Sequence, residues 1–350
     1  MPLLTAVERN RFAPIVRVVL VAIIVAVTIT LLVAPKPWEV TEAKPARSFE
    51  IVRSSLWWAG LLALPVLGVL ASTTGQWTSP LQALPRTADA GYRIPPFFWP
   101  LVTVITILYA ATAAPRLRQS LWDDEIYTVR KIVLGTERVQ GDGSVKVKQL
   151  PWSRTLWHYE VPTNHGLQSI FSRLSLGAYQ AIFRPKGLQF SETALRLPSF
   201  IAGALSIPAL ALLVARLGFP WAGVVAATLL ALHPWHLKLA TEARGYGFIF
   251  LFIPLTALCA ARVAAGGTWL WLAALAALEF ALLYTWPGTL LTVVVMNVAV
   301  LFLIFRLATS GETARKMVIR VLAANAFVAL ALLPLVAPWI PQFLDWVENT

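Results

Sequence analysis

The chain has 350 residues, of which 58% are hydrophobic and 13% are charged, and its formal net charge is +12. Soluble domains carry roughly 25% charged residues, so this composition excludes a soluble globular protein and indicates an integral membrane protein. The basic excess fits the lysine and arginine bias of cytoplasmic loops, together with anionic lipid head groups or phosphates, better than it fits nucleic acid.

The predicted fold class is an all-α polytopic membrane protein with about nine transmembrane helices. A helix that rises 1.5 Å per residue needs about 20 apolar residues to cross a hydrocarbon core of about 30 Å. The predicted spans are residues 14–34, 55–72, 94–114, 197–217, 221–239, 246–263, 268–284, 289–305 and 318–337. The first span is longer than a signal-peptide core and no small-residue cleavage site follows it, so we expect it to be retained.

The basic residues predict the orientation of a multi-pass protein in the plasma (inner) membrane. Arg9 and Arg11 place the N-terminus in the cytoplasm, which puts residues 115–196 on the outer face. Basic residues that follow later spans agree with this topology: Arg216, Arg262, Arg306, Arg315, Lys316 and Arg320 all fall inside. The loop between the first two spans also carries basic residues, so whether both of these helices cross the membrane stays open.

The outer segment is expected to have structure of its own. Residues 118–133 read as a helix, residues 138–148 as a hairpin that turns at residues 141–144, and residues 166–183 as an amphipathic helix. Polar side chains in the last of these segments indicate that it lies on the membrane surface and does not cross it.

An acidic cluster follows the third predicted span by about ten residues. Asp123, Asp124 and Glu125 open a roughly 80-residue polar segment, the longest non-apolar stretch of the chain. Carboxylates at the N-terminus of a helix complement its macrodipole and need no further role. At a membrane surface they equally suit chemistry on a substrate that is half in the membrane, and the residues alone leave both interpretations open.

Two other groups of residues could carry chemistry. Asn164 and His165 open the predicted surface helix, where Asn164 also suits a plain helix cap. Residues 242–246, Glu-Ala-Arg-Gly-Tyr, directly follow the fifth span and lie close to Lys238. A cation at the end of a span often only snorkels to the interface, but an ionisable residue there is a functional candidate by default. Arg244 is the stronger candidate of the two cations.

We expect no metal site. The four histidines, His158, His165, His233 and His236, fall on the predicted outer side, but their spacing matches no ligand motif such as H-E-x-x-H. The single cysteine, Cys259, lies in an apolar segment, which excludes an intrachain disulfide framework and a cysteine metal site.

Four short motifs in order resemble those of the C-type integral membrane glycosyltransferases. The similarity is strongest with the branch of protein O-mannosyltransferases and lipid A aminoarabinose transferases, and it spans residues 115–256. The motifs are L-W-D-D-E-I-Y at 121–127, N-H-G-L at 164–167, A-L-R-L-P-S at 194–199, and the stretch from His233-Pro234 to Glu-Ala-Arg-Gly-Tyr at 242–246. Gly166 stands where the family often has proline, and Thr241 where it often has glutamine.

The resemblance divides the chain into three regions. Residues 1–93 form an N-terminal membrane region with two extra helices, residues 94–263 the glycosyltransferase core with its outer loop 115–196, and residues 264–350 the C-terminal membrane helices. The chain stops at Thr350 without the larger C-terminal region common in the family, so we expect either a fragment or a minimal version.

The resemblance implies transfer of a sugar from a polyprenyl-phosphate donor to a hydroxyl of a lipid, glycan or protein acceptor, with inversion and without a metal or other cofactor. Asp124 matches the family's general base, and Glu125 is expected to cap or position it within the catalytic pair. Arg244 is the first candidate to bind the donor phosphate, because a guanidinium binds two phosphate oxygens at once. Lys238 and Arg116 are the further phosphate-binding candidates, and Asn164, His165, Tyr127, Glu242 and Tyr246 are expected to orient the substrate.

Two other classes of function stay open. A multi-pass transporter or lipid flippase would also have about nine helices, but few charges lie at mid-depth of the predicted spans. A non-catalytic membrane scaffold is the third interpretation. Membrane lipids are expected partners in each case, and nucleic acid in none.

Overall fold

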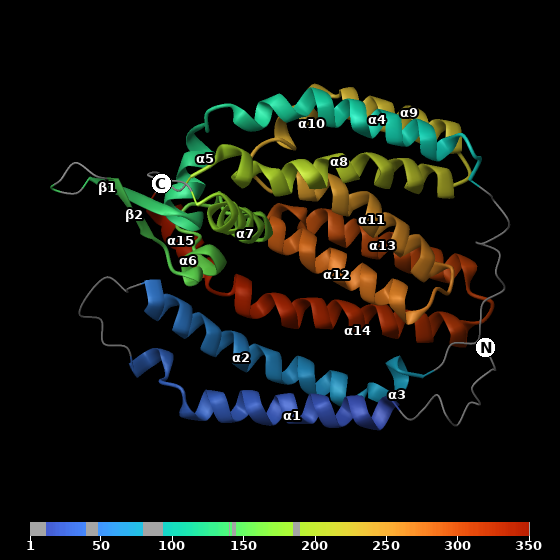
Figure 1. Cartoon of the computed structure of the whole chain (residues 1–350). Helices are drawn as coiled ribbons and strands as arrows, with labels where there is room; N and C mark the ends of the chain where they lie inside the picture. The colour runs from blue at the N-terminus through green and yellow to red at the C-terminus, as the bar shows by residue number, and fades with distance from the viewer. Residues whose placement is uncertain are drawn as a thin grey trace. The chain divides into compact units, whose positions relative to one another are not determined.

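The computed structural model describes residues 12–39, 48–79, 94–139, 141, 145–184 and 190–349. The chain forms two compact units, which are described separately (Figure 1). Unit 1 contains Met1–Ala90, Cys259–Phe280 and Val294–Thr350, and unit 2 contains Gly91–Leu258 and Ala281–Val293.

Unit 1 is helical. It contains α1 (Phe12–Val33), the 3-10 turn η2 (Pro37–Glu39), α2 (Ser48–Ser72), α3 (Thr74–Trp77), α14 (Gly311–Val336) and α15 (Trp339–Asn349). Three helices contribute only in part, because the division between the units falls within them: α11 (Tyr246–Ala264), α12 (Trp269–Thr285) and α13 (Leu290–Leu307).

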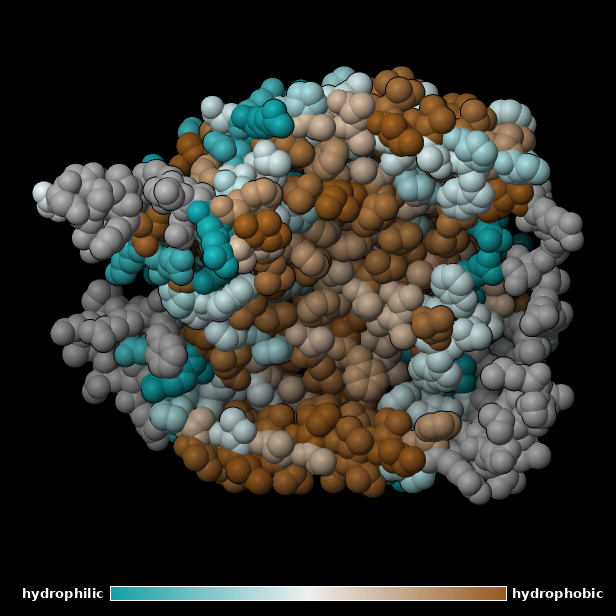
Figure 2. All heavy atoms as spheres, in the orientation of Figure 1, coloured by the Kyte–Doolittle hydropathy of each residue, from teal (hydrophilic) through white to brown (hydrophobic). Residues whose placement is uncertain are grey.

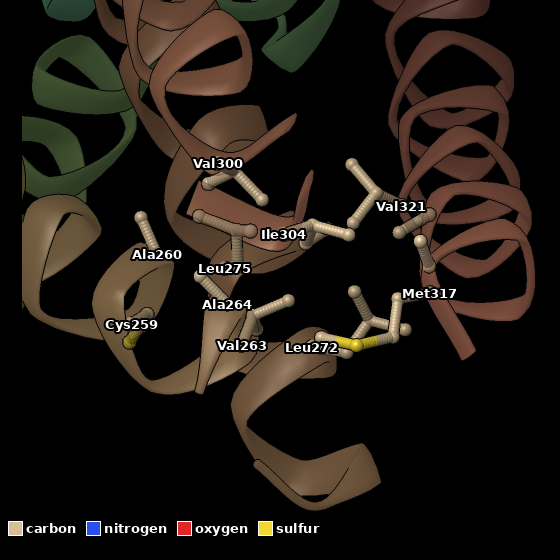
Figure 3. Close-up of a cluster of buried hydrophobic side chains, with 12 residues drawn as sticks. Cys259, Ala260, Val263, Ala264, Leu272, Leu275, Val300, Ile304, Met317 and Val321 are labelled. Atoms are coloured by element: carbon tan, nitrogen blue, oxygen red, sulfur yellow. The ribbon is translucent and has the colours of Figure 1, made fainter. Parts of the chain in front are cut away.

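Two apolar clusters hold unit 1 together. The first joins α11, α12, α13 and α14 around Leu275, Ile304 and Met317, and Figure 3 shows these side chains pointing toward one another. The second joins α1, α2, α3 and α14 and includes Leu20 and Trp77. Between lipid-exposed helices, close packing and hydrogen bonds supply the association that the hydrophobic effect supplies in water.

The outward face of α1 is apolar. Val18, Leu32 and Val33 are each more than two thirds exposed, and only two residues of the helix are buried. Figure 2 shows this helix as a nearly continuous brown band along the lower edge. Such a surface is costly in water and suits contact with lipid tails.

Unit 2 contains the polar segment and the helices around it. Its elements are α4 (Phe98–Ala113), η3 (Ala114–Arg118), α5 (Asp123–Thr128), the π-helical turn η4 (Val129–Val133), β1 (Gly135–Val139), β2 (Val145–Gln149), α6 (Trp152–Trp157), α7 (Gly166–Phe183), α8 (Glu192–Arg216), α9 (Pro220–Leu232), α10 (Pro234–Leu239) and η5 (Pro287–Thr289). The remaining parts of α11, α12 and α13 complete it.

Small residues let the helices of unit 2 approach closely. The cluster that joins α4, α8 and α9 consists largely of alanines, with Phe98, Tyr109 and Ile207 as its large members. A second cluster, with Leu195 fully buried, lies mostly within the polar segment and joins η4, α7, the start of α8 and Ala243. Close helix contacts through small side chains are typical of membrane bundles.

The described residues contain seven helices that are long and apolar enough to cross a membrane: Phe12–Val33, Glu50–Ser72, Phe98–Arg118, Glu192–Arg216, Tyr246–Ala264, Pro287–Leu307 and Gly311–Val336. Of two shorter apolar helices, Trp269–Thr285 matches the span predicted over residues 268–284. The helix Pro220–Leu232 covers only the first part of the span predicted over residues 221–239, because His233 is extended and a separate helix, α10, follows it. The chain is therefore an all-α polytopic membrane protein. The predicted number of nine spans remains a prediction, and Arg9 and Arg11 lie outside the described residues.

The helix predicted over residues 118–133 is wrong at its start: it begins at Asp123, where α5 continues directly into η4 and ends at Val133, and residues 119–122 are not helical. The carbonyls of Arg116, Gln119 and Ser120 accept hydrogen bonds from the guanidinium of Arg196. Gln119 and Trp122 adopt extended backbone angles, so a continuous helix cannot pass through them.

The other two expectations for this segment are closer to the structure. Strands β1 and β2 pair antiparallel from Gly135 opposite Gln149 to Val139 opposite Val145, while the predicted turn lies mostly outside the described residues. Helix α7 has the predicted bounds. Its polar residues Gln168, Ser169 and Ser172 are buried, so they face the protein interior.

Candidate functional site

The acidic cluster forms the first turn of α5, a short helix that begins a few residues after α4 and η3. Asp123, Asp124 and Glu125 occupy its first three positions, where their charges complement the helix dipole. The backbone N–H of Trp122 donates to Glu125 Oε2 at 3.3 Å, which closes the N-terminus of the helix. Asp123 is exposed, the side chain of Asp124 is 40% exposed, and Glu125 is fully buried.

Glu125 joins three segments of the chain. Its Oε1 accepts from Arg196 Nε at 2.9 Å, and its Oε2 accepts from Arg196 Nη2 at 2.5 Å. Oε1 also accepts from the backbone N–H of Ala243 at 2.6 Å. The carboxylate therefore fixes α5, the start of α8 and the loop between α10 and α11 relative to one another, and we call this arrangement the Glu125 clamp.

The loop held by the Glu125 clamp presents Arg244 to Asp124. Arg244 Nη1 lies 2.9 Å from Asp124 Oδ2, and the arginine side chain is only 7% exposed. The carbonyl of Arg244 accepts from Ser199 Oγ at 2.9 Å, which fixes the backbone of the loop to α8. A half-exposed carboxylate thus lies in direct contact with a buried guanidinium.

Glycine is needed where this loop meets its neighbours. A Cβ added to Gly245 would lie 2.5 Å from Thr285 Cγ2 and 2.6 Å from His165 Nδ1. A Cβ on Gly247 would lie 2.2 Å from the carbonyl oxygen of Ser199. The loop at Gly245 can therefore pack this close to His165, and the first turn of α11 at Gly247 this close to α8, only without side chains at these two positions.

Arg244 keeps donors that no described residue uses. Its Nε and Nη1 are buried and make no hydrogen bond with good geometry, although Nη1 is close enough to Asp124 for an ion pair. The aromatic rings of Trp122 and Tyr246 each lie 5.8 Å from the guanidinium carbon. Buried donors without acceptors are costly, so they indicate a place where an anionic ligand oxygen would be stabilised.

Glu242 lies in the same loop and is also buried. Burial raises the pKa of its carboxyl above the usual range, and the nearby negative charge of Glu125 adds to this effect. Its Oε2 has no hydrogen-bond partner among the described residues. Lys238 is exposed, lies 5.3 Å from the Trp235 ring, and partly opposes the rise in this pKa.

Asn164 and His165 approach the site from the start of α7. Asn164 is fully buried, and it donates to the carbonyl of His158 at 2.9 Å and accepts from Ser169 Oγ at 2.8 Å. The N-cap of α7 is His165, so the interpretation of Asn164 as a helix cap is wrong. Burial, with a smaller contribution from Arg244, lowers the pKa of His165 to about 3, and the imidazole is neutral at physiological pH.

The other predicted residues lie around this core. The ring of Tyr246 is 5.2 Å from that of His165. Tyr127, at the end of α5, lies 3.1 Å from His158 Nε2. Arg116 takes part through its carbonyl, which binds Arg196, while its Nε is buried without a partner among the described residues.

Sequence reasoning missed Arg196 as a member of the site. The residue lies in the motif A-L-R-L-P-S at residues 194–199, where a charge at the start of an apolar span was the available signal. It also missed Arg154, His158 and Glu160, which no motif marks. Within the described ranges, no group of three or more histidine, cysteine, aspartate or glutamate side chains could hold a metal ion.

Comparison of the chain with models of protein families, with curated proteins and with solved structures gives no match. The similarity to C-type glycosyltransferases therefore depends on the four motifs alone, and the residues of unit 2 carry the functional argument.

Proposed function

We propose that the chain is a membrane glycosyltransferase that moves a sugar from a polyprenyl-phosphate donor to an acceptor hydroxyl, with inversion at the anomeric carbon. The contact between Asp124 and Arg244 carries the proposal, because it pairs an accessible base with a buried cation that has unused donors. Such a transfer needs a base at the acceptor hydroxyl and a cation at the leaving phosphate.

Asp124 serves as the general base. It takes the proton of the acceptor hydroxyl as that oxygen forms a bond to the anomeric carbon. The bond between the anomeric carbon and the phosphate oxygen breaks at the same time, and its electron pair leaves with the lipid phosphate. General-base work of this kind contributes about 10²- to 10⁴-fold to a rate.

Arg244 stabilises the phosphate as negative charge develops on it. Its buried Nε has no hydrogen-bond partner among the described residues and suits a phosphate oxygen, and burial strengthens the interaction by excluding water. Lys238 and Arg116 add positive charge at the edge. Glu125 acts as the positioning residue, since Arg196, Ala243 and Trp122 already occupy both of its oxygens.

The remaining predicted residues orient the sugar and the phosphate. The groups beside Arg244 can form hydrogen bonds with the hydroxyls of an uncharged sugar ring. They are the side chains of Asn164, His165, Glu242 and Tyr246. The lipid tail of the donor would stay in the bilayer beside the apolar helices, with the sugar at the outer face of the plasma membrane.

The test replaces Asp124 with asparagine, which keeps the shape and removes the base. Sugar transfer from a radiolabelled polyprenyl-phosphate donor in proteoliposomes should fall by about 10²-fold or more, whereas binding of the donor should persist. Asp123→Asn is the matched control, because Asp123 is the exposed neighbour in the same helical turn and should leave transfer unchanged. Equal transfer by wild type and Asp124→Asn would contradict the proposal.

One observation favours the alternative of a transporter or flippase. Glu279 is buried in the apolar helix α12, accepts from Asn297 Nδ2 at 2.8 Å, and Asn297 accepts from Asn325 at 2.7 Å. Carboxyl groups inside a membrane helix often mark a transport path. In the same assay, Glu279→Gln should leave sugar transfer unchanged in a glycosyltransferase. A wild-type protein that transfers no sugar would favour the transporter or flippase.

A further inference from the structure

A second polar array borders the candidate site, built around the buried imidazole of His158. The ring is 2% exposed, and its two nitrogens contact different elements. Nδ1 lies 2.8 Å from Arg154 Nη1 on α6, and Nε2 lies 3.1 Å from the hydroxyl of Tyr127 on α5. The carbonyl of His158 accepts from Asn164, so the backbone of the residue is also fixed.

Arg154 determines which ring nitrogen carries the proton. A guanidinium has only N–H donors and does not lose its proton, so the Nδ1 atom at 2.8 Å must be an unprotonated acceptor. The proton of the neutral ring then lies on Nε2, which donates to the oxygen of Tyr127. Glu160 Oε1, 3.4 Å from Nδ1, would favour the other tautomer, but it accepts from Arg154 Nη1 at the shorter distance of 2.8 Å.

The ring stays neutral at physiological pH. Burial lowers the pKa of His158 to about 4, and the positive charges of Arg154 and Lys131 act in the same direction, while the negative charge of Glu160 opposes them. A protonated ring would also direct an Nδ1–H against the guanidinium. The charged groups that face His158 therefore preserve the tautomer with its proton on Nε2.

This tautomer decides what the Tyr127 hydroxyl can do. Its oxygen already accepts a hydrogen bond from His158, so its own proton is directed to another acceptor. Burial, together with the charge of Glu160, raises the pKa of Tyr127, which keeps the hydroxyl protonated. Tyr127 follows Asp124 by three residues in α5, and residues at this spacing lie on the same face of a helix.

We propose that Arg154 and His158 are positioning residues that make the Tyr127 hydroxyl a hydrogen-bond donor to a phosphate oxygen of the lipid donor. The inference rests on the proposed function, and it adds Tyr127 to Arg244 as a second, uncharged phosphate contact. A phosphate oxygen suits this hydroxyl because Tyr127 shares a face of α5 with Asp124, which contacts Arg244, the proposed phosphate-binding residue. The bond strengthens as the phosphate gains charge during transfer.

The first test measures the tautomer directly. Nitrogen NMR of the full chain with ¹⁵N-labelled histidine, assigned with His158→Gln, should show Nδ1 as the unprotonated nitrogen of His158. Arg154→Met should move the proton to Nδ1, which then donates to Glu160, whereas Arg154→Lys should keep the wild-type tautomer. Glu160→Gln is the control, since it retains Arg154 and should leave the proton on Nε2. An Nδ1–H in the wild type, or no change in Arg154→Met, would overturn the proposal.

The second test links the array to the phosphate. Tyr127→Phe should raise KM for the polyprenyl-phosphate sugar about tenfold, the loss expected for one hydrogen bond to a charged group. Arg154→Met should have a similar effect alone and little further effect in the Tyr127→Phe background, because both changes remove the same contact. Additive effects would show that Arg154 acts independently of Tyr127, and the proposal would fail.

The outcomes distinguish this inference from the proposed function. Sugar transfer by the wild type with an unchanged KM in Tyr127→Phe would contradict the phosphate contact alone. Wild-type protein that transfers no sugar would contradict the function, and the phosphate contact with it. A monodisperse elution profile for each variant shows that a change in KM does not come from unfolding.

Discussion

At the level of single residues, the two neighbouring carboxylates Asp124 and Glu125 have opposite environments. Asp124 is accessible and touches one cation, whereas Glu125 is fully buried and its oxygens are occupied by Arg196 and two backbone N–H groups. Removal of one partner from a buried ion pair leaves an uncompensated charge, which costs far more than loss of an exposed pair. The first carboxylate should therefore matter to activity and the second to stability.

Glu125→Gln should lower the free energy of unfolding by roughly 3 to 5 kcal/mol, because Arg196 would stay buried without its counter-charge. Thermal unfolding in detergent, followed by the fluorescence of the tryptophans, measures the effect. Glu312→Gln breaks an exposed ion pair with Lys316 on α14 and should leave the midpoint nearly unchanged. Similar midpoints for the two variants would show that the Glu125 clamp contributes little to stability.

The sequence predicted the identity of these residues better than their arrangement. The position of Asp124 after a membrane helix and of Arg244 after another was visible as charge at the ends of apolar segments. The pairing of Glu125 with Arg196 was not, because a contact across 71 residues depends on the packing of α7 and α8 and leaves no local pattern. The array around His158 was missed for the same reason.

At the level of elements, the conformation of the loop between α10 and α11 depends on its contacts with neighbouring segments. Gly245 in this loop and Gly247 at the start of α11 allow the backbone to lie against His165 and α8, and this places Arg244 and Glu242 beside α5. Helix periodicity predicted the flanking helices, but a loop that gains its form from tertiary contacts has no period to detect. The first turn of the helix expected over residues 118–133 is absent for a similar reason, since Arg196 binds the carbonyls of Gln119 and Ser120 that a helix would have used.

Gly245→Ala should displace this loop, because the new methyl group would lie within 2.6 Å of His165 and Thr285. We expect a loss of about 1 to 3 kcal/mol in stability from overpacking, together with weaker donor binding as Arg244 moves. Gly177→Ala in α7 is the matched control, since nothing lies within 4 Å of the added atom and alanine favours the helix. Thermal unfolding and donor KM report the two effects; a KM unchanged in Gly245→Ala would argue against a role of the loop in binding.

At the level of the whole molecule, hydropathy was the most reliable predictor. Eight of the nine predicted spans each overlap one helix, whereas residues 221–239 are divided at His233 into α9 and α10; seven helices among the described residues meet the length and composition needed to cross a membrane. The reason is that lipid imposes one requirement, about 20 apolar residues in a helix, which is readable from a local window. How the helices group into units could not be predicted, because unit 1 combines segments from both ends of the chain.

The predicted orientation can be tested with cysteines placed on either side of the membrane. In a Cys259→Ala background, Gly141→Cys in the hairpin should react with a membrane-impermeant maleimide from outside intact cells. Thr309→Cys, between α13 and α14, should react only after the cells are permeabilised. Both positions are exposed in the structure, so burial does not explain a difference between them. The reverse labelling pattern would place the candidate site in the cytoplasm.

The Glu125 clamp can form only late in the synthesis of the chain. Glu125 and Ala243 are 118 residues apart, and at about 5 to 20 residues per second a ribosome needs roughly 6 to 24 s to make the intervening chain. For the first 71 residues of this interval the Glu125 side chain has neither partner, and after that Arg196 is made but the loop with Ala243 is not. The nascent protein would hold Glu125 without its full set of partners until the start of α11 is in place, so insertion of that later segment would be the event that completes the Glu125 clamp.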